Sequence, residues 1–315
     1  MKNILVCGAN GFIGRNVVKN FYKKKKYKIF STYFRSRPSI ISDVKWIKAD
    51  LRNFEDCLKA TKNIDIVIQC AATTSGAKDI INQPYLHVTD NAVMNSYLLR
   101  ACYQNKIKHF IFFSCTVMYK NSKKTLSENQ VEEDKIYPNY YGVANTKLYI
   151  EKICKFYSSI SKTKFSILRH SNIYGPYDKF NLEKGHFLSS SIFKVLKQKS
   201  DKVYIFGSGK EKRDFLHVND LMNIINLLIS KQKNSYEIFN CSYGKSFSVI
   251  DILKKIINLS NSKKNIHKLM SKKSLKVDIM INSNKAKRLL NWYPKIRIDK
   301  GLKMTIDWFI KNSKD

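Results

Sequence analysis

The sequence predicts an α/β protein: a doubly wound parallel sheet of the Rossmann type, with a smaller, discontinuous C-terminal lobe. In the first half of the chain, short β-rich runs alternate with longer amphipathic stretches, which is the pattern of a parallel sheet flanked by helices. Beyond about Tyr174 this rhythm changes. The 315 residues, 43% of them apolar, are enough for a large core and an appended lobe.

The strands of the sheet are expected at five runs, two of which are nearly unbroken apolar sequences typical of strands buried on both faces. The five runs are Asn3–Cys7, Lys28–Tyr33, Ile64–Ala71, His109–Ser114 and Lys164–Leu168. Helical periodicity predicts the helices that connect these strands. They are Phe12–Lys23, Pro84–Gln104 and Gly142–Ser159.

In the second half of the chain, the sequence predicts helices and strands of which some belong to the sheet and some to the lobe. They are a helix Phe187–Gln198, a strand Val203–Phe206, a helix from about Asn219, a return to the sheet near Tyr236–Asn240, and helices Val249–Leu259 and Lys300–Ile310. We therefore expect a nucleotide-binding domain over 1–175, completed by about 219–241, and a substrate lobe over 176–218 plus 242–315. Folds of this kind bind ligands in the crevice at the carboxyl ends of the strands.

A glycine-rich loop follows the first strand and reads Gly8-Ala9-Asn10-Gly11-Phe12-Ile13-Gly14. Gly8 permits a tight turn, Gly11 lets the backbone approach a pyrophosphate, and Gly14 allows close helix packing. The helix that follows offers free N–H groups to phosphates. Because the loop lies between an apolar strand and an amphipathic helix, it predicts dinucleotide binding.

The residues after the second strand bear on the choice between NAD(H) and NADP(H). An acid there would bind the ribose 2′-hydroxyl, whereas arginine accommodates a 2′-phosphate. The sequence offers Arg35 and Arg37 and no acid, and Arg15 follows the glycine loop. These arginines favour NADP(H). Asp50-Leu51, after a third short strand, is expected near the adenine ring.

The formal charge of +34 raises the possibility of a nucleic-acid partner. The lysines are spread along the chain, however, and Lys23 to Lys26 stand where a helix should end, so nucleic acid is not expected. A positive surface also suits a small polyanionic substrate such as a nucleoside diphosphate sugar. The seven cysteines form no C-x-x-C pair, which disfavours a metal site. No apolar run suggests a membrane span or a signal peptide, so a cytoplasmic protein is expected.

Several segments together resemble one known family. They are Gly8–Gly14, Cys70-Ala71-Ala72, Phe113–Tyr119, Lys147–Glu151, Arg169–Pro176, His186, Arg213-Asp214-Phe215 and Asn291–Pro294. On these segments the chain resembles the extended short-chain dehydrogenases/reductases of the NAD-dependent epimerase/dehydratase family. Within it, the sequence is most similar to the GDP-L-fucose synthases, which are 4-keto-sugar epimerase–reductases. The resemblance implies a nucleotide-sugar substrate and adds Ala71 and Ala72 to the cofactor site.

The family uses a Tyr acid/base, a Lys that lowers its pKa, and a Ser or Thr that binds the reacting oxygen. Lys147 matches the Lys and also contributes to the cofactor site. The position four before it holds Val143. Tyr141 and Tyr140 are the nearest phenols, and we expect Tyr141 to be the acid/base, provided that a late helix start or a bulge brings it close. The other possibility is that both tyrosines are wall residues.

The Ser/Thr position of the family falls on Cys115, a weak hydrogen-bond donor. Thr116 is the first candidate to replace it and Ser114 is the second, because alternate residues of a strand share a side. Thr116-Val117 replaces the Asp-Glu pair of the family's dehydratases, so dehydration is not expected. Val117 also replaces the cysteine of the Cys/His pair with which GDP-L-fucose synthases epimerise their substrate.

Residues on the substrate side follow from the same matching. His186 matches the histidine of that pair and is a candidate acid or substrate ligand. Asn172 resembles the family's substrate-contacting Asn, and Arg213 resembles a diphosphate ligand, since its planar fork pairs with phosphate oxygens. Thr73 is expected at the junction of cofactor and sugar.

Three functions remain open from the sequence. The first is reduction of a 4-keto sugar, GDP-linked by preference, with NADPH. The second is NAD-dependent 4-epimerisation of a nucleotide sugar, which needs a retained cofactor but no Cys/His pair. The third is a cofactor-binding protein without catalytic activity. A homodimer through the helices Pro84–Gln104 and Gly142–Ser159 is implied by the resemblance.

Overall fold

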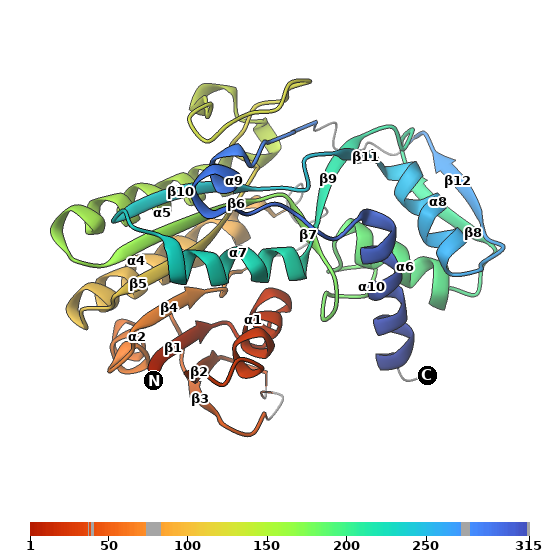
Figure 1. Cartoon of the computed structure of the whole chain (residues 1–315). Coiled ribbons are helices and arrows are strands. Elements are labelled where there is room, and N and C mark those ends of the chain that lie inside the picture. The colour runs from red at the N-terminus through yellow and green to blue at the C-terminus, as the bar shows by residue number, and fades with distance from the viewer. Residues whose placement is uncertain (37, 39–40, 74–82, 272–277, 314–315) are drawn as a thin grey trace.

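A seven-stranded parallel sheet lies at the centre of the larger part of the chain (Figure 1). The computed structural model describes residues 1–36, 38, 41–73, 83–271 and 278–313. The strand order is β10-β6-β5-β4-β1-β2-β3, and every neighbouring pair is parallel. The strands are β1 (Lys2–Cys7), β2 (Tyr27–Tyr33), β3 (Val44–Lys48), β4 (Ile66–Gln69), β5 (His109–Cys115), β6 (Lys164–His170) and β10 (Tyr236–Cys241). The predicted fold class is confirmed.

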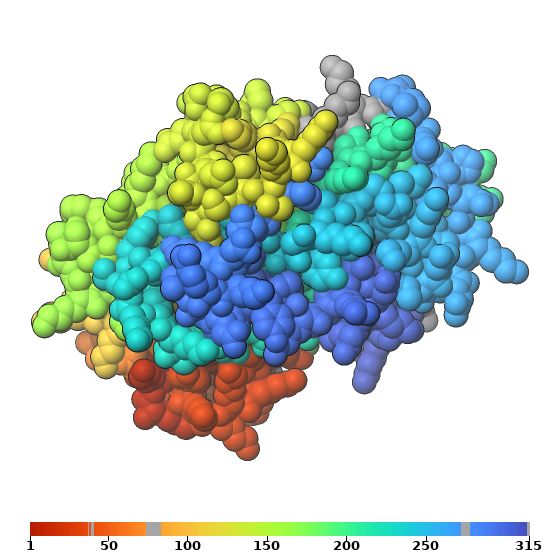
Figure 2. All heavy atoms as spheres, turned by 45° about the horizontal axis from the view of Figure 1, so that its top comes forward, coloured from red at the N-terminus to blue at the C-terminus, as the bar shows by residue number. Residues whose placement is uncertain are grey.

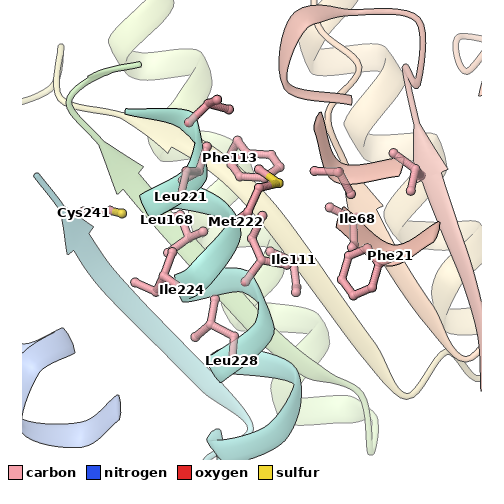
Figure 3. Close-up of a cluster of buried hydrophobic side chains, with 14 of the residues drawn as sticks. Phe21, Ile68, Ile111, Phe113, Leu168, Leu221, Met222, Ile224, Leu228 and Cys241 are labelled. Carbon is pink, nitrogen blue, oxygen red and sulfur yellow. The ribbon is translucent and has the colours of Figure 1, made fainter. Parts of the chain in front are cut away.

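Helices cover both faces of this sheet because its strands are apolar on both sides. One face packs against α1 (Phe12–Tyr22), α7 (Val218–Lys231) and α9 (Asn284–Leu290). The other packs against α2 (Phe54–Thr61), α4 (Thr89–Gln104) and α5 (Tyr141–Ile160). Figure 3 shows part of the first layer, where side chains of α7 such as Leu221 and Leu228 lie with Ile111 and Leu168 of the sheet. Burial of this apolar surface is the main stabilising contribution.

The smaller part of the chain lies beside the sheet and has its own apolar cluster (Figure 1). It contains β8 (Lys202–Phe206) paired with β12 (Asn265–Leu269), and the helices α6 (Phe187–Lys197), α8 (Val249–Leu259) and α10 (Ile298–Asn312). Between the two parts runs a three-stranded sheet of β7 (Asn172–Tyr174), β9 (Lys212–His217) and β11 (Ser246–Ser248). No helix of the described residues is long and apolar enough to cross a membrane.

The segment that follows β5 lies beside the residues just before α9 and is hydrogen-bonded to them (Figure 2). The Ser122 and Leu126 amides donate to the carbonyls of Asp278 and Met280, both at 2.9 Å. This segment includes short 3₁₀ helices at Glu133–Lys135 and Pro138–Tyr140, and another, Pro84–His87, precedes α4. The crossing segment packs on the first turns of α5. It therefore borders the carboxyl ends of the central strands.

Buried histidines predict how stability depends on pH. Burial lowers the pKa of His109, His170 and His217 from 6.5 to about 4. In the unfolded chain these histidines take up a proton at the ordinary pKa of 6.5, whereas in the folded protein they stay neutral down to about pH 4. Their contribution to the free energy of unfolding is therefore complete above pH 6.5 and is lost as the pH falls toward 4. We expect Tm, followed by calorimetry, to fall over this interval. His109→Asn should reduce the fall, and the control His267→Asn, at a half-exposed ring, should not. A constant Tm would contradict the prediction.

Candidate active site

The glycine loop between β1 and α1 has the shape of a phosphate cradle. Gly8 has φ +65°, and a Cβ there would lie 2.6 Å from the Ala71 Cα. A Cβ at Gly14 would lie 2.3 Å from the Gly8 carbonyl oxygen. A Cβ at Gly11 would meet only that oxygen, at 3.3 Å, so the surface at Gly11 is open to a ligand. Helix α1 begins at Phe12 and points its N-terminus at this surface. These residues fit a dinucleotide pyrophosphate.

The other predicted cofactor residues differ in what their side chains do. The Asn10 amide donates to the Ser36 carbonyl at 2.9 Å, at the end of β2. Phe12 and Ile13 are half-buried against the core, and Leu51 is buried in it. The Arg15 guanidinium lies 6.0 Å from the centre of the Tyr177 ring. The Arg15, Phe12, Ile13 and Leu51 side chains therefore contact protein, and the loop backbone is what faces the cradle.

The side chains beyond β2 show how the positive charge there is balanced. The Arg35 guanidinium stacks over the Phe34 ring at 5.1 Å. Asp50 forms an ion pair with Arg52 at 2.9 Å. The pKa of Asp50 is lowered mainly by its hydrogen bond from Arg52, with a further contribution from Arg35. An acid therefore does lie beside this end of the site, although it comes from the end of β3 and not of β2. Arg37 lies outside the described residues.

Lys147 lies on the second turn of α5 and reaches the end of β5. Its Nζ donates to the Phe113 carbonyl at 2.9 Å and lies 4.6 Å from the centre of the Phe112 ring. Burial lowers the pKa of Lys147, and the nearby Cys115 and Glu151 oppose that shift. Lys147 is therefore a desolvated cation at the carboxyl end of the central sheet, where a reacting oxygen would need one.

The structure separates the three residues at the end of β5. Ser114 is fully buried and donates to the Glu151 carboxylate at 2.6 Å, and Glu151 is paired with Arg169 at 2.6 Å. Ser114 therefore belongs to a buried polar network. Cys115 is half-buried and interacts with Lys147, while burial raises the pKa of its thiol. Thr116 is half-buried, and its carbonyl accepts the Tyr119 amide at 3.0 Å in the turn that follows.

The two candidate tyrosines have opposite environments. Tyr141 is 63% exposed and lines a shallow surface pocket formed by residues of 84–88 and 138–142. Tyr140 is 8% exposed, and its phenol lies near Arg213 and Cys115: burial raises its pKa and Arg213 opposes the shift. Helix α5 is continuous from Tyr141 onward, without the bulge that would bring Tyr141 toward Lys147. Val143 packs in an apolar cluster.

The substrate-side candidates lie on different elements: Asn172 on β7, Arg213 on β9, and Thr73 after β4. The Asn172 amide donates to the Asp214 carbonyl at 2.9 Å, next to Arg213. Arg213 is half-buried in β9, and its Nε has no hydrogen-bond partner among the described residues. Thr73 exchanges backbone hydrogen bonds with the Asn91 side chain, at 2.9 and 3.0 Å. The buried Nε therefore leaves one donor of the Arg213 guanidinium unpaired among the described residues.

His170 is a site residue that the sequence analysis did not single out. It is the register partner of Cys115 in the β5–β6 ladder. Its Nδ1 lies 2.8 Å from the Ser171 carbonyl, and Lys147 and His186 both lie close enough to lower its pKa. His186 is exposed and stands at the start of α6. The sequence carried only a weak signal for it, since His170 comes two residues after the predicted strand Lys164–Leu168 and Cys115 directly follows the predicted strand His109–Ser114.

Comparison with known proteins identifies the family. The model of the NAD dependent epimerase/dehydratase family matches residues 4–242. This chain belongs to that family. The UDP-glucuronate 4-epimerase of Thermodesulfobacterium geofontis is 28% identical over 98% of this chain and 96% of its own. The GDP-L-fucose synthase of Escherichia coli is 22% identical over 80% of this chain and 82% of its own. The family predicted from the sequence is confirmed.

A solved structure of this epimerase/dehydratase family bears on the cofactor. The UDP-glucuronic acid 4-epimerase of Bacillus cereus, in complex with UDP-glucuronic acid and NAD, has a TM-score of 0.85 and 25% identity, covering 98% of this chain and 99% of that one. Our expectation of NADP(H) over NAD(H) is therefore wrong. The physical reason lies in the structure: two of the arginines that favoured NADP(H) lie against aromatic rings, Arg35 over Phe34 and Arg15 beside Tyr177.

Proposed function

We propose that this protein is an NAD-dependent 4-epimerase of a nucleoside diphosphate sugar, with a uridine-linked sugar as the substrate. The main support is the full-length similarity to UDP-glucuronate 4-epimerases, in sequence and in structure. Lys147 and the glycine loop are two of the parts of the site that such a reaction requires. The reduction of a GDP-linked 4-keto sugar, which the sequence analysis favoured, has less support.

The chemistry of C4 explains why this site is sufficient. A C4–H bond beside a hydroxyl is not acidic, so its configuration is inverted by oxidation to a ketone and reduction on the other face. Bound NAD supplies the place where the hydride is held between these steps. The chain binds the sugar, excludes water and moves one proton at the C4 oxygen. It needs no proton exchange at neighbouring carbons, which is consistent with Val117 in place of a cysteine.

The nucleotide sugar is proposed to lie between the central sheet and the 176–218 plus 242–315 lobe. Arg213 would bind the diphosphate, and Asn172 and Thr73 would contact the sugar side. His186, exposed next to His170, is proposed as a sugar ligand. The catalytic part of the site is proposed to contain Lys147 and Thr116, with Thr116 binding substrate through its exposed side.

The test is to incubate purified protein with UDP-glucuronate, UDP-glucose and UDP-N-acetylglucosamine and to follow the anomeric signals by proton NMR. We expect at least one substrate to form its C4 epimer without consumption of added NADH or NADPH. Arg213→Ala should weaken substrate binding by about 100-fold, since it removes a charge-assisted pair. Absence of any C4 epimer would contradict the proposal. Steady NADPH consumption with a GDP-4-keto sugar would instead support the reductase.

We also propose that the protein is a homodimer, because α5 carries a row of exposed aromatic and aliphatic side chains. On α5, Tyr149, Phe156 and Ile160 are 44%, 56% and 46% exposed. Tyr149 is held by a 3.0 Å hydrogen bond to Ser96 of the neighbouring α4, so this face is ordered across both helices. A second copy presenting the same face would cover it.

Phe156→Glu is expected to disrupt this homodimer. Burying a carboxylate in the contact should weaken association by at least about 30-fold, as for a hot-spot aromatic residue. Sedimentation velocity would measure the shift toward monomer. Tyr204→Glu is the matched control, since Tyr204 is an aromatic residue of similar exposure on β8. A wild-type monomer, or equal effects of both variants, would contradict the proposed interface.

A further inference from the structure

A buried aspartate of β9, Asp214, holds the loop that follows β10. Asp214 is 3% exposed, and its carboxylate accepts three successive backbone N–H groups. They come from Tyr243 at 2.8 Å, Gly244 at 2.6 Å and Lys245 at 3.2 Å. Gly244 has φ +82°, a left-handed conformation that lets neighbouring N–H groups point at one anion. The loop of residues 243–245 is therefore folded around a negative charge that another strand supplies.

The strand after this loop, β11, connects Lys245 with Arg213. β11 pairs antiparallel with β9, and Phe247 is the register partner of Arg213 (Figure 1). Side chains directly opposite each other in an antiparallel pair share a face, with Cβ atoms about 5 Å apart. The Lys245 ammonium lies 5.7 Å from the centre of the Phe247 ring. Lys245 and Arg213 therefore both lie beside the Phe247 side chain.

Neither of these two cations is paired with a carboxylate in the part of the chain that the structure describes. Lys245 is exposed, and its ammonium contacts only the Phe247 ring among those residues. The Arg213 Nε is buried there without a hydrogen-bond partner. Asp214 is the neighbouring acid, but both of its carboxylate oxygens are occupied by N–H groups of the loop. Two unpaired cations beside one ring suit a ligand that carries two adjacent anionic groups.

We propose that Lys245 is a second ligand of the substrate diphosphate, beside Arg213, and that Asp214 is the positioning residue that brings Lys245 there. This inference rests on the proposed function, because the diphosphate belongs to the nucleotide sugar. The planar guanidinium of Arg213 would pair with phosphate oxygens, and the Lys245 ammonium would act as a compact point charge beside it. Asp214 does not touch the ligand: it acts through the backbone of the 243–245 loop.

Lys245→Ala is expected to raise the Kd for UDP about 10-fold, measured by titration calorimetry on the full chain with NAD in excess. Lys245→Arg keeps the charge and should bind UDP within about threefold of the wild type. The control is Lys212→Ala, which removes the same charge from β9. Lys212 is exposed and precedes Arg213, but successive side chains of a strand point to opposite faces, so UDP binding should change less than about twofold. Equal effects of Lys245→Ala and Lys212→Ala, or none from Lys245→Ala, would overturn the proposal.

Asp214→Asn tests the positioning role by the same titration. The carboxamide offers one acceptor oxygen in place of two, and its NH₂ group would face N–H donors, so the loop should separate from β9. We expect the Kd for UDP to rise about 10-fold, and the double variant with Lys245→Ala to bind no more weakly, because Lys245 is already displaced. Losses that simply add in the double variant would overturn the positioning role of Asp214.

Asp220→Asn is the matched control for a buried aspartate that holds a loop. Asp220 is fully buried, and its carboxylate accepts the backbone N–H groups of Lys295 and Ile296, both at 3.0 Å. Asp220→Asn should therefore lower the Tm as Asp214→Asn does, while the Kd for UDP stays at the wild-type value. If Asp220→Asn weakened UDP binding as much as Asp214→Asn, a general loss of stability would explain both variants, and the positioning role would be overturned.

Binding of UDP separates this inference from the proposed reaction. A wild type that binds UDP with the expected variant effects but forms no C4 epimer would overturn only the reaction. In an active enzyme, Lys245→Ala should raise the KM about 10-fold with kcat within about twofold, and an unchanged KM would overturn only the inference. The same variant effects with GDP in place of UDP would support the diphosphate site and overturn the uridine-linked substrate. A wild type that binds neither nucleotide would overturn the diphosphate site itself.

Discussion

Replacing Lys147 with alanine is expected to lower kcat about 1,000-fold, the range found for loss of a group that assists proton transfer. The ammonium is desolvated, is held at the end of β5 by the Phe113 carbonyl, and is one of two cations, with Arg169, that lower the pKa of Cys115 against the larger effect of burial. Without it, the site loses a buried cation that would stabilise negative charge on a reacting oxygen. Substrate binding should change much less, because Arg213 and Lys245, which are proposed to hold the diphosphate, are on other elements.

Lys152→Ala is the control for this variant. Lys152 lies on the same helix, five residues further on, and forms an exposed ion pair with Glu133 at 2.8 Å. An exposed pair of this kind contributes little to stability. We expect full activity in Lys152→Ala and thermal unfolding near the wild-type Tm in both variants. A Lys147→Ala enzyme that keeps more than about a tenth of wild-type kcat would exclude a catalytic role for this lysine.

Gly14→Ala is expected to abolish NAD binding at ordinary concentrations. The added Cβ would lie 2.3 Å from the Gly8 oxygen and 2.8 Å from the Ala9 Cα, which are backbone atoms that cannot give way cheaply. We expect the Kd for NAD to rise at least about 100-fold, or about 2.7 kcal/mol. The free energy of unfolding should fall by about 2 kcal/mol, as for an overpacked site. Titration calorimetry and denaturant unfolding would measure the two effects.

Gly11→Ala is expected to weaken NAD binding with little loss of folding stability. Its Cβ would be 3.3 Å from the Gly8 oxygen, a tight contact that a small adjustment relieves. The methyl group would nevertheless occupy the surface that a pyrophosphate approaches, so NAD binding should weaken with less than about 1 kcal/mol lost from unfolding. If Gly14→Ala bound NAD as the wild type does, the loop would not be the cofactor cradle.

The parallel sheet could be predicted because its signal is local and strong. Unbroken apolar runs such as that of β5 leave few other interpretations, and the glycine loop fixes the first strand and helix. The short strands β7, β9 and β11 were not predicted. Three- to six-residue strands carry little periodicity, and their pairing depends on contacts between distant segments.

The details of the site were harder to predict than the fold. The opposite environments of Tyr140 and Tyr141 could not be predicted, because they depend on where α5 begins and on how the Pro138–Tyr140 turn packs. The cofactor prediction failed because it was based on the arginines that follow the second strand, and the stacking of Arg35 on Phe34 could not be predicted from the sequence. The bond of Ser114 to the buried Glu151 could not be predicted either, because it depends on how α5 packs against β5.

The most direct test of the proposed function is the fate of the C4 hydrogen in deuterium oxide. The enzyme would be incubated with UDP-glucuronate, and with the other two nucleotide sugars if that one is inert, and the epimer examined by NMR. We expect a C4 epimer that retains its original hydrogen at C4, with no deuterium at C3 or C5 and no net change in reduced nicotinamide. Deuterium at the neighbouring carbons, or stoichiometric consumption of a reduced cofactor, would contradict it.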